Sequence, residues 1–212
     1  MTLRNLIANK ELGAIQQALE QNPELANEGI PYDDQNTANA HPLHRICDGV
    51  MSGTYSDEEA VEMAKIFLKY GANVNGDEQV DNRDTPLVAA ASLHAEKVGI
   101  LYIEKGAAIN HPGCYGGIPL HWAAWTGRDK LVQRLIEAGA EINRRCIEFD
   151  STPLLWAVHG FKFGGPENRH NQIECVRLLL AAGADKNTPN KEGTLPIRFL
   201  NEQDVELRQL LS

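Results

Sequence analysis

Four residues near the start of the chain have the types and the spacing of metal ligands. His41, His44 and Cys47 are each three residues apart, so a helix would bring them to one side, and Asp48 follows directly. Imidazole nitrogens, thiolates and carboxylates are the groups that hold zinc in proteins. One interpretation of the segment is therefore a small metal- or ligand-binding enzyme that uses the His41–Asp48 helix.

The other candidate ligands and catalytic groups are weaker. Asp77, Glu78, Asp81 and Asp84 cluster in one turn, but their spacing lacks the twelve-residue pattern of a calcium loop, and we expect a solvated acidic turn. No nucleophile elbow, phosphate-binding glycine loop or metalloprotease helix occurs. The four cysteines form no Cys-x-x-Cys pair, which indicates reduced thiols. We therefore predict no catalytic residue, no cofactor and no bound metal.

A proline-centred motif recurs along the chain and indicates the fold that would position these residues. The prolines of its five copies are 44, 33, 34 and 43 residues apart. The copies are His41-Pro42-Leu43-His44, Thr85-Pro86-Leu87-Val88, Ile118-Pro119-Leu120-His121, Thr152-Pro153-Leu154-Leu155 and Leu195-Pro196-Ile197-Arg198. A Gly-Ala pair follows the first four copies, at Gly71, Gly106, Gly139 and Gly183. Two independent markers that keep one phase indicate an internal repeat.

Each copy has the pattern of two short helices joined by a turn. Thr85 can cap a first helix through its hydroxyl, and the proline after it suits the first helical turn. In the third copy the apolar spacing of residues 131–136 predicts a second helix, which Gly139 ends. A unit of this size cannot bury its apolar face alone, so neighbouring units must stack.

These motifs resemble the ankyrin repeat, whose 33-residue period and Thr-Pro-Leu-His-x-Ala signature are matched most closely by Ile118 to Asn143. The resemblance covers about residues 37–200. It implies an all-α ankyrin-repeat solenoid of stacked helix-turn-helix units with extended turn tips. It also implies that His44 and His121 make structural hydrogen bonds, which we favour over a metal site.

The chain departs from the family pattern at the helix starts. His41, Ile118 and Leu195 stand where the family has threonine, so three of the five copies lack a hydroxyl cap. We expect the fifth copy, and also the first, to be looser for this reason.

We expect one domain over residues 1–212, with a polar capping unit at each end. The N-terminal cap spans residues 3–28 and the C-terminal cap residues 191–212. The repeats are expected at about residues 37–75, 81–110, 114–143 and 148–187. The first and fourth are longer by about nine and ten residues, within Asp48–Ser56 and Gly160–His170, and we expect both insertions in the turn between the two helices.

The resemblance implies a protein-interaction module rather than an enzyme, because partners of this family usually meet the concave groove of turn tips and first helices. Tryptophan, tyrosine and arginine dominate such contacts. We expect Trp125 at an outward helix position that packing does not explain, whereas Trp122 and Trp156 are expected to be mainly core. The predicted partner-binding residues are Tyr115, Trp125, Arg144, Arg145, Phe149, His159, Phe161 and Phe163. The alternative for Phe149 and Phe161 is that they fold back onto their own loops.

The net charge of −9 comes from one half of the chain. Residues 1–115 hold 8 Lys and Arg against 17 Asp and Glu, whereas residues 116–212 hold 12 of each. An acidic surface repels phosphate backbones and attracts cations, so we expect no nucleic acid but a protein partner, for which a basic segment is one expected feature. No apolar run reaches the roughly 18 residues of a membrane span. We expect a cytoplasmic monomer that binds no membrane; a self-associating structural repeat is the remaining alternative.

Overall fold

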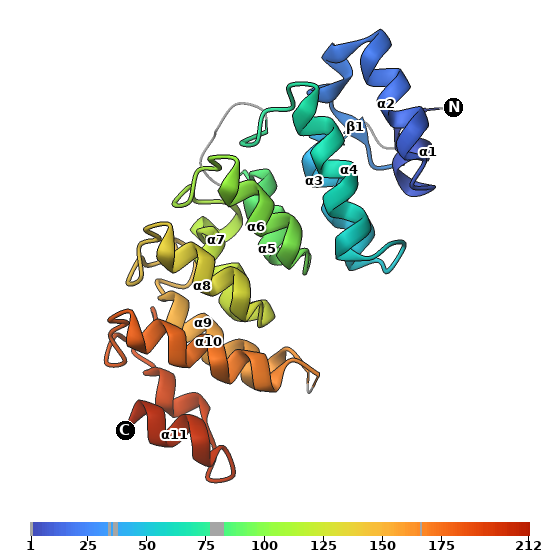
Figure 1. Cartoon of the computed structure of the whole chain (residues 1–212). Coiled ribbons are helices and arrows are strands. Elements are labelled where there is room, and N and C mark those ends of the chain that lie inside the picture. The colour runs from blue at the N-terminus through green and yellow to red at the C-terminus, as the bar shows by residue number, and fades with distance from the viewer. Residues whose placement is uncertain (1, 34, 36–37, 77–82, 166) are drawn as a thin grey trace. The chain divides into compact units, whose positions relative to one another are not determined.

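The computed structural model describes residues 2–33, 35, 38–76, 83–165 and 167–212. The packing of the chain divides it into two compact units (Figure 1). The first unit is Met1–Val80 with Thr85–Ala108, and the second is Asp81–Asp84 with Ile109–Ser212. Both consist of helix pairs joined by turns, which confirms the predicted all-α repeat of stacked helix-turn-helix units. One domain over residues 1–212 stays a prediction.

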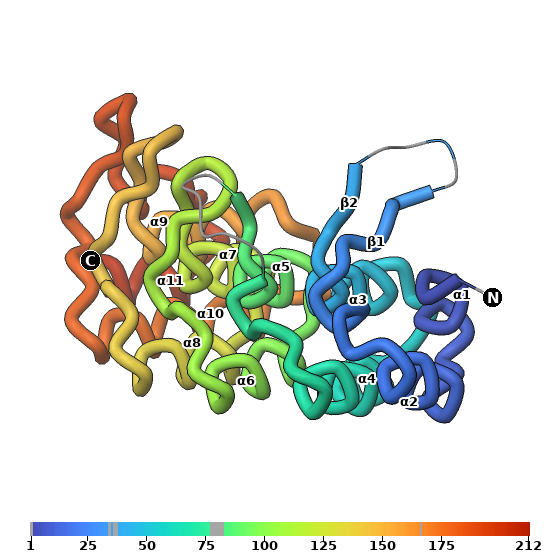
Figure 2. Tube along the Cα trace, turned by 90° about the horizontal axis from the view of Figure 1, so that it is seen from above, coloured from blue at the N-terminus to red at the C-terminus, as the bar shows by residue number. Residues whose placement is uncertain are grey.

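The first unit contains the N-terminal helix pair and the next two pairs. Its elements are α1 Leu3–Ala8, α2 Leu12–Gln21, the 3-10 helix η1 Pro23–Ala26, β1 Ile30–Pro31, β2 Asn39–Ala40, α3 Pro42–Met51, α4 Asp57–Lys69, α5 Pro86–Ser92 and α6 Glu96–Glu104. The two short strands pair antiparallel, with Ile30 opposite Ala40, and lie next to α3 (Figure 2). Successive pairs stack, since α3 packs against α5 and α4 packs against α6.

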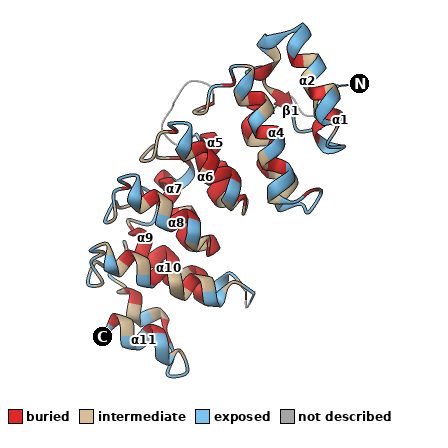
Figure 3. Cartoon of the chain, viewed as in Figure 1, coloured by how far each residue is buried: buried red, intermediate tan, exposed pale blue. Residues whose placement is uncertain are grey.

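The second unit repeats this arrangement. Its elements are the 3-10 turn η2 Cys114–Gly116, α7 Pro119–Thr126, α8 Asp129–Glu137, α9 Pro153–Phe163, α10 Arg169–Ala181, the 3-10 turn η3 Pro196–Phe199 and α11 Val205–Leu211. First helices pack on first helices, α7 against α9, and α10 packs against both α9 and α8. Buried residues lie mainly on the helices, whereas exposed residues occupy the joining loops and also parts of α8, α10 and α11 (Figure 3). On α8, Leu131, Val132 and Leu135 are fully buried, as their spacing predicts.

Side chains cap the first helices of the first, second and fourth copies. Thr85 and Thr152 each accept a hydrogen bond from the backbone N–H three residues on, at 3.4 Å. In the first copy His41 accepts one through Nδ1 from the N–H two residues on, at 3.2 Å. In the third copy Ile118 provides no capping side chain, and its own N–H donates to Nδ1 of His121, also at 3.2 Å. In the first copy histidine therefore takes the place of the missing hydroxyl as the cap of the helix, whereas the expected looseness of that copy stays a prediction.

The fifth copy is built differently from the others. After Leu195 it forms only the single 3-10 turn η3 in place of an α-helix, and α11 follows. The terminal pair is thus shorter than the repeats before it, as expected. At the other end α2 ends at Gln21, directly before Asn22-Pro23, where the Asn22 side chain caps η1.

The longer first and fourth repeats have longer helices as well as longer turns, which corrects the expectation that the extra residues lie in the turn alone. α3 and α9 have 10 and 11 residues, against 7 and 8 in α5 and α7. The second helices α4 and α10 have 13 each, against 9 in α6 and α8. On α9 the physical reason is burial, since Phe161 is only 7% exposed, whereas the buried Tyr55 lies in the turn between α3 and α4.

Candidate functional site

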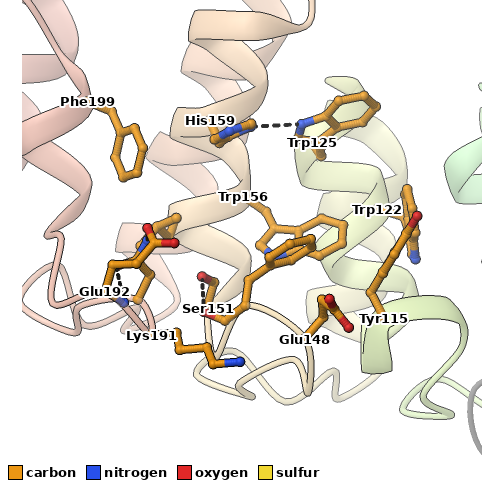
Figure 4. A pocket seen from close by; sticks show the side chains of 13 residues that line it. Tyr115, Trp122, Trp125, Glu148, Ser151, Trp156, His159, Lys191, Glu192 and Phe199 are labelled. Atoms are coloured by element: carbon orange, nitrogen blue, oxygen red, sulfur yellow. Dashed lines mark hydrogen bonds between the residues drawn. The ribbon is translucent and has the colours of Figure 1, made fainter.

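The second unit carries a groove of about 850 Å³ whose lining is mainly aromatic (Figure 4). Its walls come from η2, the first helices α7 and α9, the turns before α9 and η3, and η3 itself. Six large aromatic side chains line it: Tyr115, Trp122, Trp125, Phe149, Trp156 and Phe199. All three tryptophans of the chain are among them.

Four of these rings, Tyr115, Trp122, Trp156 and Phe149, form a closed cycle, which we call the four-ring cluster. Going round it from Tyr115, the centroids of consecutive rings are 6.1, 5.0, 6.1 and 5.6 Å apart. These are the separations of aromatic pairs in contact. Two of the rings come from turns and two from first helices, so two consecutive repeats build the cluster together.

Backbone hydrogen bonds between neighbouring turns hold the two turn residues of the cluster. The carbonyl oxygen of Tyr115 accepts from the N–H groups of Ile147 and Glu148, at 3.0 and 3.1 Å. The carbonyl oxygen of Phe149 accepts from the N–H of Lys191 at 3.0 Å. Tyr115 adopts φ 60°, a conformation uncommon for a bulky side chain. Such strain persists where surrounding contacts enforce it, and here the hydrogen bonds between turns do so.

His121 supports the cluster from the core. Its ring is fully buried and meets the Trp156 ring edge-on, with centroids 5.3 Å apart. Because Nδ1 accepts from the N–H of Ile118, Nε2 carries the proton and donates to the carbonyl oxygen of Ser151 at 3.0 Å. Burial lowers the pKa of His121 to about 4, so the ring is neutral near pH 7. This is the structural role that the family resemblance implies.

The end of the groove away from Tyr115 is built around a second histidine. Trp125 Nε1 donates a hydrogen bond to Nδ1 of His159 at 3.4 Å (Figure 4). The His159 ring also packs against Phe163 and Phe199, with centroids 4.5 and 5.8 Å away. Burial lowers the pKa of His159 and keeps its nitrogen an acceptor. Trp125 is partly buried, and its position is therefore not the unsupported outward one that we predicted.

Two carboxylates and one ammonium group reach the groove. Figure 4 shows Glu148 beside Tyr115 at one end, whereas Glu192 lies toward the other end. The Glu192 carboxylate accepts a hydrogen bond from the Asn190 side chain at 3.2 Å. In the part of the chain that the structure describes, the carboxylate of Glu148 has no hydrogen-bond or ion-pair partner. The cation of the lining is Lys191.

The structure brings four of the eight predicted partner-binding residues together in the groove: Tyr115, Trp125, Phe149 and His159. Phe149 is 45% exposed and lines the groove. Its ring packs against Tyr115 and Trp156, so it does not simply fold back onto its own loop. The other four predicted residues lie outside the groove.

Those four are occupied by other contacts or separated from the groove. Arg144 and Arg145 form ion pairs with Glu141 and Asp150. Phe163 is 63% exposed and lies beyond His159, against which it packs. Phe161 is only 7% exposed, with a guanidinium group over its ring, so its side chain is not available to a partner as we had expected.

Three aromatic residues of the groove were not among the predicted ones. Trp122 and Trp156 were expected to be mainly core, and Trp156 is only 7% exposed, yet both line the groove. Their shared position, three residues after the motif proline, was the available signal. Phe199 lies in the degenerate fifth copy and occupies the same position, three residues after Pro196.

The segment with metal-ligand spacing uses its side chains locally. His41 is 4% exposed, and its Nε2 lies 3.2 Å from the side-chain oxygen of Asn27. The thiol of Cys47 donates to a carbonyl oxygen of its own helix, and burial raises its pKa well above the usual value. Asp48 pairs with Arg45. Among the described residues, no three His, Cys, Asp or Glu side chains gather as metal ligands.

The acidic turn falls largely outside the described residues, since Asp77, Glu78 and Asp81 belong to the part that is not described. The carboxylate of Asp84, which is described, accepts a hydrogen bond from the N–H of Cys114 at 2.8 Å. Across the described residues, no helix combines the length and the hydropathy needed to cross a lipid bilayer.

Comparison with known proteins matches the repeat pattern to family models. A model of three ankyrin repeat copies matches residues 51–146, and a model of a single ankyrin repeat matches residues 149–191. Alpha-latrotoxin-Lt1a of Latrodectus tredecimguttatus is 35% identical over 180 residues, which are 84% of this chain and 12% of the toxin.

Two further relatives are similar over shorter stretches. Palmitoyltransferase Hip14 of Drosophila melanogaster is 33% identical over 91 residues, 43% of this chain and 13% of that protein. Ankyrin repeat and SAM domain-containing protein 6 of Rattus norvegicus is 34% identical over 129 residues, 57% of this chain and 13% of that protein. The matched part of this chain thus spans about an eighth of the length of these relatives.

Proposed function

Because this chain belongs to the ankyrin repeat family, we propose that it is a non-enzymatic module that binds a protein partner through the groove of its second unit. The observation that carries the proposal is the lining of the groove by six large aromatic side chains. Tryptophan and tyrosine contribute most to binding when a partner covers them, because they remove a large area from water. In this proposal the third and fourth repeats supply most of the binding energy.

The partner that we propose carries a basic segment. The charge of −9 falls within residues 1–115, most of which belong to the first unit, and a field of this sign speeds the approach of cations. The groove lining contains two carboxylates, Glu148 and Glu192, and one lysine, so the lining is also slightly acidic. Electrostatic attraction would steer the partner, and the aromatic rings would hold it.

The activities named for the relatives are not part of this proposal. Palmitoyltransferase Hip14 shares only 13% of its length with this chain, and the rest of that protein has no counterpart in the match. We propose instead a monomer that acts in the cytoplasm. In support, the described cysteines form no disulfide bond with one another, as expected in a reducing compartment.

The test is the double replacement Tyr115→Ala with Trp125→Ala in the whole chain. A partner is first captured from native lysate and purified, and its affinity for each protein is then measured by isothermal titration. We expect the double variant to bind at least about 30-fold more weakly, as the loss of two central aromatic contacts implies. Met51→Ala is the control, since Met51 is 55% exposed and belongs to the first unit. An unchanged affinity of a folded double variant would contradict the assignment of the groove.

A further inference from the structure

We propose that the four-ring cluster is a pocket for a guanidinium group, so that the partner places an arginine side chain on these rings with its charge against Glu148. This inference rests on the proposed function, since it names the chemistry of the segment that the groove receives. Two independent features of the groove support it. One is the arrangement of the rings, and the other is that the Glu148 carboxylate has no ion-pair or hydrogen-bond partner among the described residues.

The first feature is the geometry of the rings. The faces of aromatic rings carry partial negative charge, and a cation within about 6 Å of a ring centroid is attracted to it. Consecutive centroids of the cluster are 5.0 to 6.1 Å apart, so a cation at its mouth lies within reach of more than one ring. The planes of Tyr115 and Phe149 are tilted by 37° and those of Trp122 and Trp156 by 79°. The rings therefore do not cover one another face to face.

The second feature is the carboxylate of Glu148. Its backbone N–H is bonded to the carbonyl oxygen of Tyr115, which keeps this residue at the edge of the cluster. The neighbouring arginines of the same turn, Arg144 and Arg145, already have acidic partners in Glu141 and Asp150. Glu148 has none among the described residues, although it lines the groove. A carboxylate at the edge of an aromatic pocket is complementary to a cation held by the rings.

Arginine fits this combination better than lysine does. A guanidinium group is planar, stacks on aromatic faces and donates two parallel hydrogen bonds to a carboxylate. It is also more weakly hydrated than an ammonium group, so less water must be removed when it enters an apolar groove. An apolar side chain would fill the same space but would leave the Glu148 carboxylate facing it, which is unfavourable. The charge of the pocket therefore selects the occupant.

The experiment uses four pools of blocked heptapeptides that are identical except for the central residue, which is arginine, citrulline, lysine or leucine. Citrulline has nearly the shape of arginine but no charge. Binding to the whole chain is followed by intrinsic tryptophan emission, because all three tryptophans line the groove and report on it directly. We expect the arginine pool to bind about ten-fold tighter than the citrulline pool, with the lysine pool in between.

A matched pair of variants tests the role of the carboxylate. Glu148→Gln keeps the shape of the side chain and removes its charge, and we expect it to reduce the preference for arginine over citrulline to about three-fold or less. Glu167→Gln is the control, since Glu167 is exposed, belongs to the same unit and does not line the groove. It should leave the preference unchanged. Thermal unfolding of both variants verifies that they are folded.

Three results would overturn the inference: equal binding of the arginine and citrulline pools, tighter binding of the leucine pool, or no response of tryptophan emission to any pool at millimolar concentration. None of them concerns the captured partner. The proposed function fails separately, if the Tyr115 and Trp125 double variant binds that partner with unchanged affinity. A groove that prefers leucine would still be a protein-binding groove, but with an apolar anchor.

Discussion

The indole nitrogen of Trp125 donates a hydrogen bond to Nδ1 of His159, 3.4 Å away, and so joins the first helices of two consecutive repeats. His159 in turn packs against Phe199 of the next copy. One wall of the groove is therefore continuous over three copies of the repeat. The same side chains that face the groove also hold the repeats together. Effects on binding must for this reason be separated from effects on stability. His159 lines the groove and His121 does not, so a comparison of the two helps to do this.

Replacement of His121 by alanine should lower the free energy of unfolding by about 3 kcal/mol. The ring is fully buried, and its loss leaves the N–H of Ile118 and the carbonyl of Ser151 without their partners. Urea unfolding at pH 7.5 measures the change. His159→Ala is the comparison: His159 is only partly buried, water can replace its hydrogen bond, and the loss should be about 1 kcal/mol. Equal losses in the two variants would contradict the role given to His121.

The stability should also depend on pH through His121. Its pKa is about 4 in the folded chain, against an ordinary value of about 6.5 when the chain is unfolded. Between these values the unfolded state binds the proton and the folded state does not, so the folded state loses stability as the pH falls below about 6.5. The nearby charge of Arg144 acts in the same direction.

The check is the difference in unfolding free energy between the natural chain and His121→Ala at two pH values. Carboxylates titrate in both proteins, so their contribution largely cancels in the difference. We expect the advantage of the natural chain to shrink by about 2 kcal/mol between pH 7.5 and pH 5. A difference that stays constant, or grows toward low pH, would show that the ring is not held neutral by burial.

Features that repeat within the chain could be predicted from the sequence. The proline motif placed the first helices, and the buried face of Leu131, Val132 and Leu135 follows from their spacing. The hydrogen-bonding role of His121 followed from the family resemblance. Each of these features depends on contacts within one repeat or on contacts that every repeat makes with the next. One copy of the repeat therefore predicts the structure of the others.

Features that depend on a particular neighbour could not be predicted in the same way. Phe161 seemed available because it lies in an extra segment, but the helix continues through it and buries it. Trp156 is buried, as expected, but its place in the groove lining depends on Phe149, whose ring packs against it from the preceding turn. Phe199 has the same spacing from its proline as Trp122 and Trp156, but only the packing of η3 against α9 shows that it reaches the groove. The spacing within one repeat does not encode these contacts between neighbouring repeats.

A close approach between first helices gives a third prediction. A methyl group at Gly160 would overlap the backbone carbonyl oxygen of Trp125, which also accepts a hydrogen bond from Gln172. Because backbone cannot move aside as a side chain can, Gly160→Ala should cost about 3 kcal/mol. Gly13→Ala is the matched control on α2: nothing lies within 4 Å of its added methyl, so it should stabilise the chain by about 0.5–1 kcal/mol. Thermal unfolding of the two variants should therefore shift in opposite directions.

The strained backbone of Tyr115 separates binding from stability at a single position. Its φ of 60° is readily adopted by glycine but is unfavourable for any residue with a Cβ atom. Tyr115→Gly and Tyr115→Ala remove the same ring from the four-ring cluster, so both should weaken partner binding to the same extent. Their stabilities should differ, with the glycine variant more stable than the alanine variant by about 1 kcal/mol.

Urea unfolding and partner titration of the two variants together test this prediction. The carbonyl oxygen of residue 115 accepts two backbone hydrogen bonds from the next turn, so both replacements leave these bonds in place. If alanine proved as stable as glycine, the turn would not be held in the left-handed conformation in solution. If instead the two variants bound the partner differently, the backbone of the turn would contribute to binding beyond positioning the Tyr115 ring. The conformation of this turn, and not only its side chain, would then be part of the binding surface.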